Sequence, residues 1–406
     1  MIDMVTIKNI KTFITAPNRC DLVVVKIETS DPKIYGLGCA TFTQRALAVK
    51  TAIDEYLAPL LYGRCVNNIE DLWQSMYGNS YWRNGPVLNN AISGIDEALW
   101  DIKGKMLGAP LYELFGGKCR KGARVYLSGN AYGSDTESVV RCVQDRLDAG
   151  YKYIRVGGPK ASEEAIEEAK RQAPEGSIFG GCVAPDEFIE GCIEQFKTLR
   201  ERFGYGPKFM LDVHEKLTPP EMLKLAKRLE PYDLFFLEDS FSPEKLEWLN
   251  FLRMNTSTPL AIGELFNNEN EYKYVITNRL TDYIRCHISQ LGGITPARKV
   301  AVLAEQFGVK TVWHGPNDLS PVGVAAQLHI DLAIPNFGIQ EYTVPTKALN
   351  EVFPGSPELK GSYVYVNEEP GLGVDFDEEA AEQYPPVGYA PTRFIDRLPD
   401  GTVIRS

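Results

Sequence analysis

The sequence predicts an α/β fold in which a (β/α)₈ barrel follows a smaller α+β domain. Three observations support this prediction. Residues 5–45 have the pattern of antiparallel strands, and residues 45–117 have a helical period. From about residue 120, short apolar runs alternate with amphipathic helices. Strands that alternate with helices are typical of a parallel sheet, and eight such units close into a barrel.

The N-terminal domain is predicted from strands that are followed by a helix. Residues 22–29 are rich in the β-branched side chains typical of a strand. Residues 87–107 repeat apolar side chains at helical spacing, with Asn90 or Ser93 as candidate N-caps. The Gly-Ala-Pro sequence at 108–110 is expected to stop this helix. Strands followed by a helical block indicate a compact α+β domain.

The barrel prediction rests on eight short apolar runs separated by helical patterns. We place these strands near residues 125–128, 153–156, 209–213, 234–238, 260–264, 283–287, 310–313 and 338–341. Within residues 157–190 we expect one helix, at 163–172, and then a loop that ends at Pro185. The tail after Glu341 is rich in proline and glycine, so we expect a wrapped extension rather than a third domain.

Three acidic residues each close one of these apolar runs. They are Asp212, Glu238 and Glu264, and they are spaced by 26 residues. Acids in equal register at the carboxyl ends of successive parallel strands would converge at one end of a barrel, where such enzymes keep their sites. Because neighbouring carboxylates repel, we expect a cation among them, and Mg²⁺ suits oxygen ligands best. The alternative is that they are ordinary strand-end acids that face solvent.

A histidine follows the first of these acids. Residues i and i+2 of a strand share a face, so Asp212 and His214 are expected to point the same way. The carboxylate would hold the ion, and the imidazole, which titrates near neutrality, would act as acid or base on the substrate. The alternative is a structural histidine or a further metal ligand.

Further candidates lie at the ends of later strands. His314 precedes an abrupt Gly-Pro turn that would leave its imidazole facing the pocket, unless it is a capping histidine bound to a backbone carbonyl. Arg285, two residues before His287, could clamp a substrate carboxylate or form an ion pair with the metal acids. Glu341 could accept hydrogen bonds from substrate hydroxyls. The turn at 292–296 leads into a predicted helix N-terminus, which suits an anion.

Composition narrows the class of partner. The chain has 406 residues and a net charge of −11, which argues against nucleic-acid or anionic-membrane partners. Its eight cysteines are scattered without a CxxC pair, as in proteins with reduced thiols. No apolar run approaches the ~20 residues needed to cross a bilayer, and the N-terminus lacks the apolar core of a signal peptide. We therefore expect a cytoplasmic protein.

The motifs around these residues resemble those of one family. They are Leu211-Asp212-Val213-His214-Glu215, Phe236-Leu237-Glu238-Asp239, Gly263-Glu264-Leu265-Phe266, Ile284-Arg285-Cys286-His287, Gly292-Gly293-Ile294-Thr295-Pro296 and Trp313-His314-Gly315. The sequence resembles the enolase superfamily, and within it the mannonate dehydratase subgroup, also called the D-galactonate dehydratase family. The resemblance covers nearly the whole chain.

The resemblance implies a modified TIM barrel over residues 121–345, an α+β capping domain over 1–120, and a C-terminal extension over 346–406 that returns to the cap. It implies Mg²⁺ on the three acids and loss of water from a small-molecule acid sugar. A base removes the proton α to the carboxylate, and an acid protonates the departing 3-hydroxyl. His214 and His314 are the implied catalytic residues, and family members commonly form homo-oligomers. The implied substrate contacts are Gln44, Arg285, His314, Asp318 and Glu341.

Four positions depart from the pattern of the family. The tyrosine that serves as base on the second strand is absent after Arg155. Ser128 stands in place of a histidine, and Pro316 in place of an alanine. Arg405-Ser406 stands in place of a terminal tryptophan. The sequence therefore predicts a Mg²⁺-dependent dehydratase of aldonates with weak or no mannonate activity. The alternatives are a metal-binding sugar-acid sensor and an acid-sugar epimerase, which would need a second base, either His314 or a lysine near Lys152.

Overall fold

The computed structural model describes residues 4–128 and 132–404, so Arg405 and Ser406 lie outside the described residues. Contacts between residues divide the chain into two compact units, and each unit consists of three stretches of sequence. The first unit takes residues 1–125, 264–274 and 285–389, and the second takes 126–263, 275–284 and 390–406. These stretches differ from the predicted domain bounds, which stay predictions.

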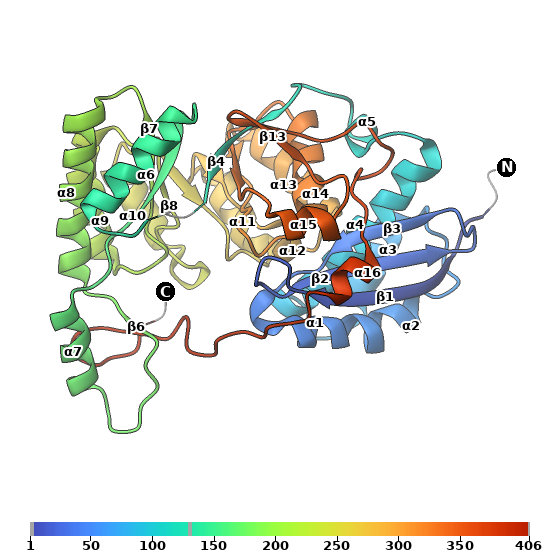
Figure 1. Cartoon of the computed structure of the whole chain (residues 1–406), viewed down its shortest axis with the longest axis horizontal. Coiled ribbons are helices and arrows are strands. Elements are labelled where there is room, and N and C mark those ends of the chain that lie inside the picture. The colour runs from blue at the N-terminus through green and yellow to red at the C-terminus, as the bar shows by residue number, and fades with distance from the viewer. Residues whose placement is uncertain (1–3, 129–131, 405–406) are drawn as a thin grey trace. The chain divides into compact units, whose positions relative to one another are not determined.

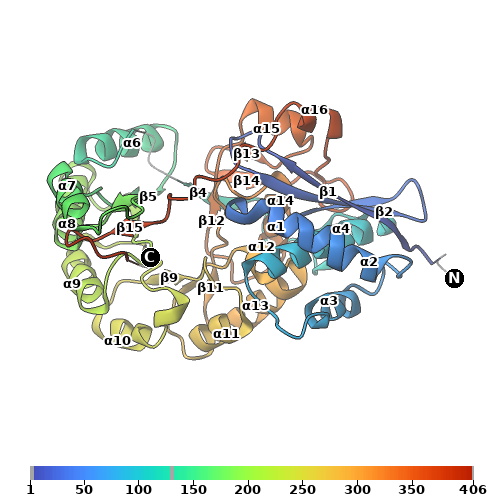
Figure 2. The same ribbon diagram turned by 90° about the horizontal axis from the view of Figure 1, so that it is seen from below.

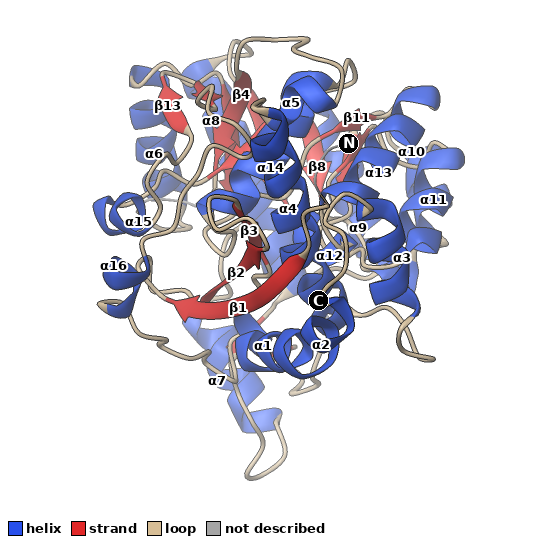
Figure 3. Ribbon diagram, turned by 90° about the vertical axis from the view of Figure 1, so that its right-hand side faces the viewer, coloured by secondary structure: helices blue, strands red, loops and turns tan. Residues whose placement is uncertain are grey.

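The first unit begins with the predicted antiparallel strands. They are β1 (Ile7–Thr15), β2 (Leu22–Thr29) and β3 (Tyr35–Cys39), paired in the order β1-β2-β3. A helical block follows, with η1 (Thr43–Arg45), α1 (Ala46–Thr51), the π-helical turn η2 (Ala52–Leu57), α2 (Ala58–Leu61), α3 (Ile69–Gly78), α4 (Pro86–Leu107) and α5 (Leu111–Leu114). Alternate side chains of β2, including Val23, Val25 and Ile27, are buried in a core shared with α4. Figure 3 shows the three strands beside α4.

Helix α4 begins earlier than the predicted caps. Its N-cap is Gly85, and Pro86 fills the first turn, where the missing N–H of proline costs nothing. The prediction of Asn90 or Ser93 as cap was therefore wrong. Both are buried within the helix, where Asn90 donates to the Pro86 carbonyl and Ser93 to the Cys39 carbonyl. The predicted stop is confirmed, because Gly108 adopts a left-handed conformation (φ 63°) as C-cap.

Helix α4 and strand β3 touch backbone to backbone at Gly38. A Cβ atom added there would lie 1.9 Å from the Gly94 carbonyl oxygen. We expect Gly38→Ala to lower the free energy of unfolding by about 3 kcal/mol, because the helix must move off the sheet. Urea or thermal unfolding measures this. The matched control is Gly78→Ala on α3, where a Cβ meets nothing within 4 Å. Equal unfolding midpoints for the two variants would contradict the expectation.

The eight predicted strands are all present and alternate with helices. The strands are β4 (Ala123–Leu127), β5 (Tyr153–Gly157), β7 (Lys208–Asp212), β8 (Phe236–Glu238), β9 (Leu260–Ile262), β10 (Tyr283–Ile284), β11 (Lys310–Thr311) and β12 (Gln340–Tyr342). The helices between them are α6 (Thr136–Asp148), α7 (Glu163–Gln172), α8 (Pro185–Phe203), α9 (Pro219–Leu229), α10 (Trp248–Asn255), α11 (Glu269–Thr277), α12 (Ile288–Leu291), α13 (Ile294–Gln306) and α14 (Pro321–Ala333).

The second unit holds a parallel sheet in the order β5-β7-β8-β9-β10. Helices α6, α8, α9 and α10 lie along its outer side (Figure 2). Helix α7 has the predicted bounds, and the loop after it ends at Pro185 as expected. That loop also contains a short strand that the sequence did not predict. It is β6 (Gly181–Cys182), and it pairs in parallel with β15 (Asp396–Arg397) of the C-terminal segment (Figure 1).

The C-terminal tail contains α15 (Lys347–Val352), β13 (Glu358–Lys360), β14 (Tyr363–Tyr365) and α16 (Glu378–Glu382) before β15. Within the first unit this tail contacts the N-terminal strands. Thr15 donates to the Tyr384 carbonyl, and Lys26 pairs with Glu378 at 2.5 Å. No helix among residues 4–128 and 132–404 is long and apolar enough to cross a membrane.

Candidate active site

Two of the three predicted acids lie side by side. In the parallel pairing of β7 with β8, Asp212 stands directly opposite Glu238. Glu238 is fully buried, whereas Asp212 is partly exposed. One carboxylate oxygen of each, together with one of Asp239, lies within 4.8 Å of the others. The structure thus brings together three oxygen donors from the end of two neighbouring strands.

The third acid does not have the equal register that its spacing predicted. Glu238 pairs with Ala261, so Glu264 lies three residues beyond the aligned position and past the end of β9. The 26-residue spacing between Glu238 and Glu264 gave the wrong register because it includes a turn at Gly263, where φ is 138°. Glu264 belongs to the first unit, and its convergence with Asp212 and Glu238 stays a prediction.

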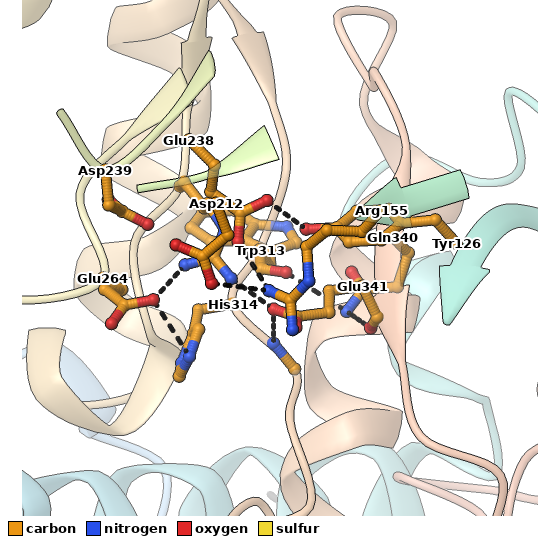
Figure 4. A network of polar contacts seen from close by, with 12 residues as sticks. Tyr126, Arg155, Asp212, Glu238, Asp239, Glu264, Trp313, His314, Gln340 and Glu341 are labelled. Carbon is orange, nitrogen blue, oxygen red and sulfur yellow. Dashed lines mark hydrogen bonds and ion pairs between the residues drawn. The ribbon is translucent and has the colours of Figure 1, made fainter. Parts of the chain in front are cut away.

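A partly buried arginine supplies positive charge to the acid pair. Arg155 Nη1 lies 2.6 Å from Glu238 Oε1 and 3.4 Å from Asp212 Oδ2 (Figure 4). Tyr126 donates its hydroxyl hydrogen to Glu238 Oε2 at 3.3 Å. Sequence reasoning missed this role of Arg155. A lone arginine inside an otherwise apolar strand was the available signal, because buried arginines are normally paired with acids.

Asp239 is a second residue that sequence reasoning missed. Strand alternation would send its side chain away from that of Glu238. However, β8 ends at Glu238, and Asp239 adopts φ 45°. Its Oδ1 accepts a hydrogen bond from the Gly263 amide at 3.2 Å. Asp239 therefore anchors the turn that leads into Glu264.

His214 lies where the chain leaves the strand, not on it. Strand β7 ends at Asp212, and both His214 (φ 57°) and Glu215 (φ 54°) are left-handed. The alternation of a strand stops before His214, so it does not support the predicted shared face of Asp212 and His214, which stays a prediction. Hydrogen bonds from Val213 N to Glu238 O and from Glu215 N to Asp239 O hold this turn. Two successive non-glycine residues with positive φ are strained, as often occurs at functional sites.

In the first unit, Arg285 joins two acids. Its guanidinium is fully buried, pairs with Glu264, and donates from Nη2 to Glu341 Oε2 at 2.5 Å. The three charges of this buried triad stabilise one another, because removing any one of them would leave an unpaired buried charge, which is very costly. These contacts match the ion-pair alternative for Arg285. Substrate contacts of Arg285 and Glu341 stay predictions.

His314 faces a carboxylate and does not cap a helix. Its Nε2 lies 3.3 Å from Glu264 Oε2 (Figure 4). The capping role belongs instead to His287, whose Nδ1 accepts the Ser289 N–H at the start of α12. The rings of the two histidines lie 5.1 Å apart, and Asp318 lies beside them. Burial raises the pKa of the Asp318 carboxyl, and His314 partly offsets this.

The turn at 292–296 already holds an anion of the protein itself. The Asp96 carboxylate accepts from Thr295 N at 2.9 Å and from Thr295 Oγ1 at 2.5 Å. Burial raises the Asp96 pKa to about 7, while hydrogen bonds from Thr295 oppose that rise. This helix N-terminus therefore fixes α4 and is not a substrate site.

Gln44 lies in the 3₁₀ turn η1 after β3, half-buried, and its contact with substrate stays a prediction. Ser128 directly follows β4, and its carbonyl accepts a hydrogen bond from Arg146 at 3.4 Å.

Comparison with known proteins gives the family. A family model described as enolase C-terminal domain-like matches residues 138–380, and the N-terminal domain model of mandelate racemase and muconate lactonizing enzyme matches residues 1–116. A D-galactonate dehydratase family member from Musicola paradisiaca is 51% identical, covering 98% of this chain and 99% of the relative. The chain belongs to the D-galactonate dehydratase family.

Other members of the D-galactonate dehydratase family agree with this assignment. One from Salmonella enteritidis is also 51% identical, over 98% of each chain. The crystal structure of an enolase from Pantoea ananatis with bound D-gluconate and Mg is 50% identical, with a TM-score of 0.93, and covers 99% of this chain and 100% of that one. These matches confirm the predicted fold, a capping domain with a modified TIM barrel. They also confirm the predicted enzyme class, a carbon–oxygen lyase of the enolase superfamily.

Proposed function

We propose that this protein is a Mg²⁺-dependent dehydratase of aldonates, with weak or no activity on mannonate. One observation carries the proposal. The Pantoea ananatis relative, which is similar over the full chain, holds D-gluconate and Mg. Gluconate is an acid sugar with a proton α to its carboxylate, as the predicted reaction requires. The proposed partner of this chain is therefore a small acid sugar.

The residues present suit a magnesium ion. Asp212, Glu238 and Asp239 offer only oxygen donors, which hard divalent cations prefer. Asp212 Oδ1 is buried and has no hydrogen-bond partner in the described part of the chain, so it is available as a ligand. We propose Asp212, Glu238 and Glu264 as the ligands. When bound, the ion neutralises negative charge that develops on the substrate carboxylate as the α-proton leaves.

The proton transfers fall to histidine. We propose that His214 removes the α-proton and, in the absence of the family tyrosine, also protonates the departing hydroxyl. One group can serve both steps only on one face of the substrate, so the elimination is syn. The strained turn at His214 and Glu215 supports this role, because it is fixed by hydrogen bonds to the strand that carries Glu238. His314 is the second proposed catalytic group.

A sugar-acid sensor without turnover is the second candidate. It is favoured by the segment from Gly157 to Ala184, which contains no tyrosine although it occupies the position of the base in the family pattern. A sensor would keep the metal acids and the substrate contacts but lack the proton transfer.

A panel of aldonates that includes D-gluconate and D-mannonate, assayed with Mg²⁺, tests the proposal. We expect formation of a 2-keto-3-deoxy acid from at least one member and little or none from D-mannonate. Binding of each member is measured in parallel by calorimetry. Binding without turnover of any member would establish the sensor in place of the enzyme. Conversion to an epimer without loss of water would establish the epimerase.

A further inference from the structure

A partly buried cluster of polar side chains in the first unit extends beyond the residues assigned so far. It consists of His287, His314 and Asp318, here called the His-His-Asp cluster. One donor or acceptor atom from each lies within 4.8 Å of the others. His287 is 4% exposed, and Ser289 holds its ring in place. None of the proposed roles above uses His287.

The protonation of His287 follows from its contacts. Its Nδ1 accepts the Ser289 N–H at 3.1 Å, so that nitrogen carries no hydrogen. Burial, with a further contribution from His314, lowers the pKa of His287 to about 3, so the ring is neutral near pH 7. The single ring hydrogen therefore sits on Nε2. His287 offers a hydrogen-bond donor there and no lone pair for a metal ion.

The other two members offer acceptors. His314 Nδ1 and Asp318 Oδ1 are buried, and neither has a hydrogen-bond partner among residues 4–128 and 132–404. His314 Nε2 lies 3.3 Å from Glu264 Oε2, so in the neutral tautomer the ring hydrogen sits on Nε2 and Nδ1 is left as an acceptor. Buried polar atoms without partners are costly, so a ligand that satisfies them binds with a gain.

The spacing of the cluster fits one oxygen atom. Because the three atoms lie within 4.8 Å of one another, one point can be placed at most about 2.8 Å from each of them, which is within ordinary hydrogen-bond length. A hydroxyl oxygen can accept one hydrogen bond and donate another, which matches the donor and the acceptors of the cluster. A carboxylate cannot donate, so it would leave both acceptors unsatisfied.

We propose that His287 is a specificity-determining residue that donates from Nε2 to one hydroxyl of the acid sugar, while that hydroxyl donates to Asp318 or His314. This rests on the proposed acid-sugar ligand. The chemistry is that of a hydroxyl oxygen, which a trapped water also possesses, and the experiment below separates the two. His287 selects sugars that carry a hydroxyl at this position over deoxy analogues.

The test is a binding cycle with two matched substitutions. His287→Asn keeps an acceptor for the Ser289 N–H, since asparagine is a good N-cap, but it has no donor in place of Nε2. His287→Gln places an amide N–H there instead. His329→Asn is the control. His329 is likewise buried and accepts a backbone N–H through Nδ1, from Tyr112, but it lies outside the cluster.

Dissociation constants with Mg²⁺ are measured for D-gluconate and its 4-, 5- and 6-deoxy analogues. We expect one analogue to bind the wild type about tenfold more weakly than D-gluconate, and we expect this penalty to disappear in His287→Asn. It should be restored in part by His287→Gln and unchanged in His329→Asn. Unchanged penalties in His287→Asn, or equal weakening of every ligand as for a trapped water, would overturn the proposal. Binding without turnover would refute only the proposed reaction, whereas no binding of any acid sugar to the wild type would refute both.

Discussion

Replacing Glu238 with glutamine is expected to weaken Mg²⁺ binding by at least about a hundredfold while the fold persists. Glutamine has nearly the same shape but lacks the charge, and even substitutions outside the ligand shell of a metal commonly cost 10–100-fold in affinity. Glu238 stands opposite Asp212 and is fully buried, so solvent cannot replace the lost charge. Calorimetric titration with Mg²⁺ measures the effect, and far-UV circular dichroism checks the fold.

A surface acid supplies the control for this experiment. Glu247, an exposed residue at the start of α10, undergoes the same loss of charge in Glu247→Gln and should bind Mg²⁺ as the wild type does. Asp239→Asn tests whether the Asp239 carboxylate is a ligand of the metal ion or only anchors the turn at Gly263. Its Oδ1 already accepts a hydrogen bond from the Gly263 amide. If Glu238→Gln retained wild-type affinity for Mg²⁺, the proposed metal site would be wrong.

Replacing His214 with asparagine is expected to lower kcat by about a thousandfold. General acid–base groups contribute about 10²–10⁴-fold, and a thousandfold loss corresponds to about 4 kcal/mol in the barrier. Asparagine is chosen because it tolerates the left-handed conformation that His214 adopts, so the turn can persist. The assay is formation of the 2-keto-3-deoxy product from the best aldonate of the panel.

Exchange of the α-proton in D₂O separates the two proposed roles of His214. If His214 is the base, the variant loses exchange together with product formation. If it is only the acid, exchange continues while dehydration stops. A kcat within tenfold of the wild type would exclude His214 from both roles. His329→Asn, which alters a buried histidine outside the site, should lower stability and leave kcat unchanged.

The sequence predicts the strands well because most of them are buried apolar runs bounded by turns. It predicts the Asp212–Glu238 pair because the equal spacing corresponds to a real alignment of neighbouring parallel strands. It wrongly aligns Glu264 with Glu238, because the number of residues between two acids does not show which of those residues are in a strand and which are in a turn. The left-handed turn at His214 and Glu215 also escapes prediction. Non-glycine residues rarely adopt positive φ, and hydrogen bonds to the carbonyls of Glu238 and Asp239 hold the turn.

The pairings between distant segments are the other part that the sequence does not predict. Strands β6 and β15 have two residues each, too few to show any period. The ion pairs of Arg155 with Glu238 and of Arg285 with Glu341 also depend on contacts between segments that are far apart in sequence. In both cases the stabilising contacts are made with a segment that is distant in sequence, so no local pattern of side chains predicts them.

The division of each unit into three stretches has a consequence for how the chain folds as it is synthesised. The first unit needs residues up to 389 and the second needs residues 390–406, so each unit is complete only when its own last stretch has emerged from the ribosome. Contacts of such long sequence separation form slowly. Partly folded chains would therefore expose apolar strands during synthesis, and chaperones would be expected to assist most at that stage.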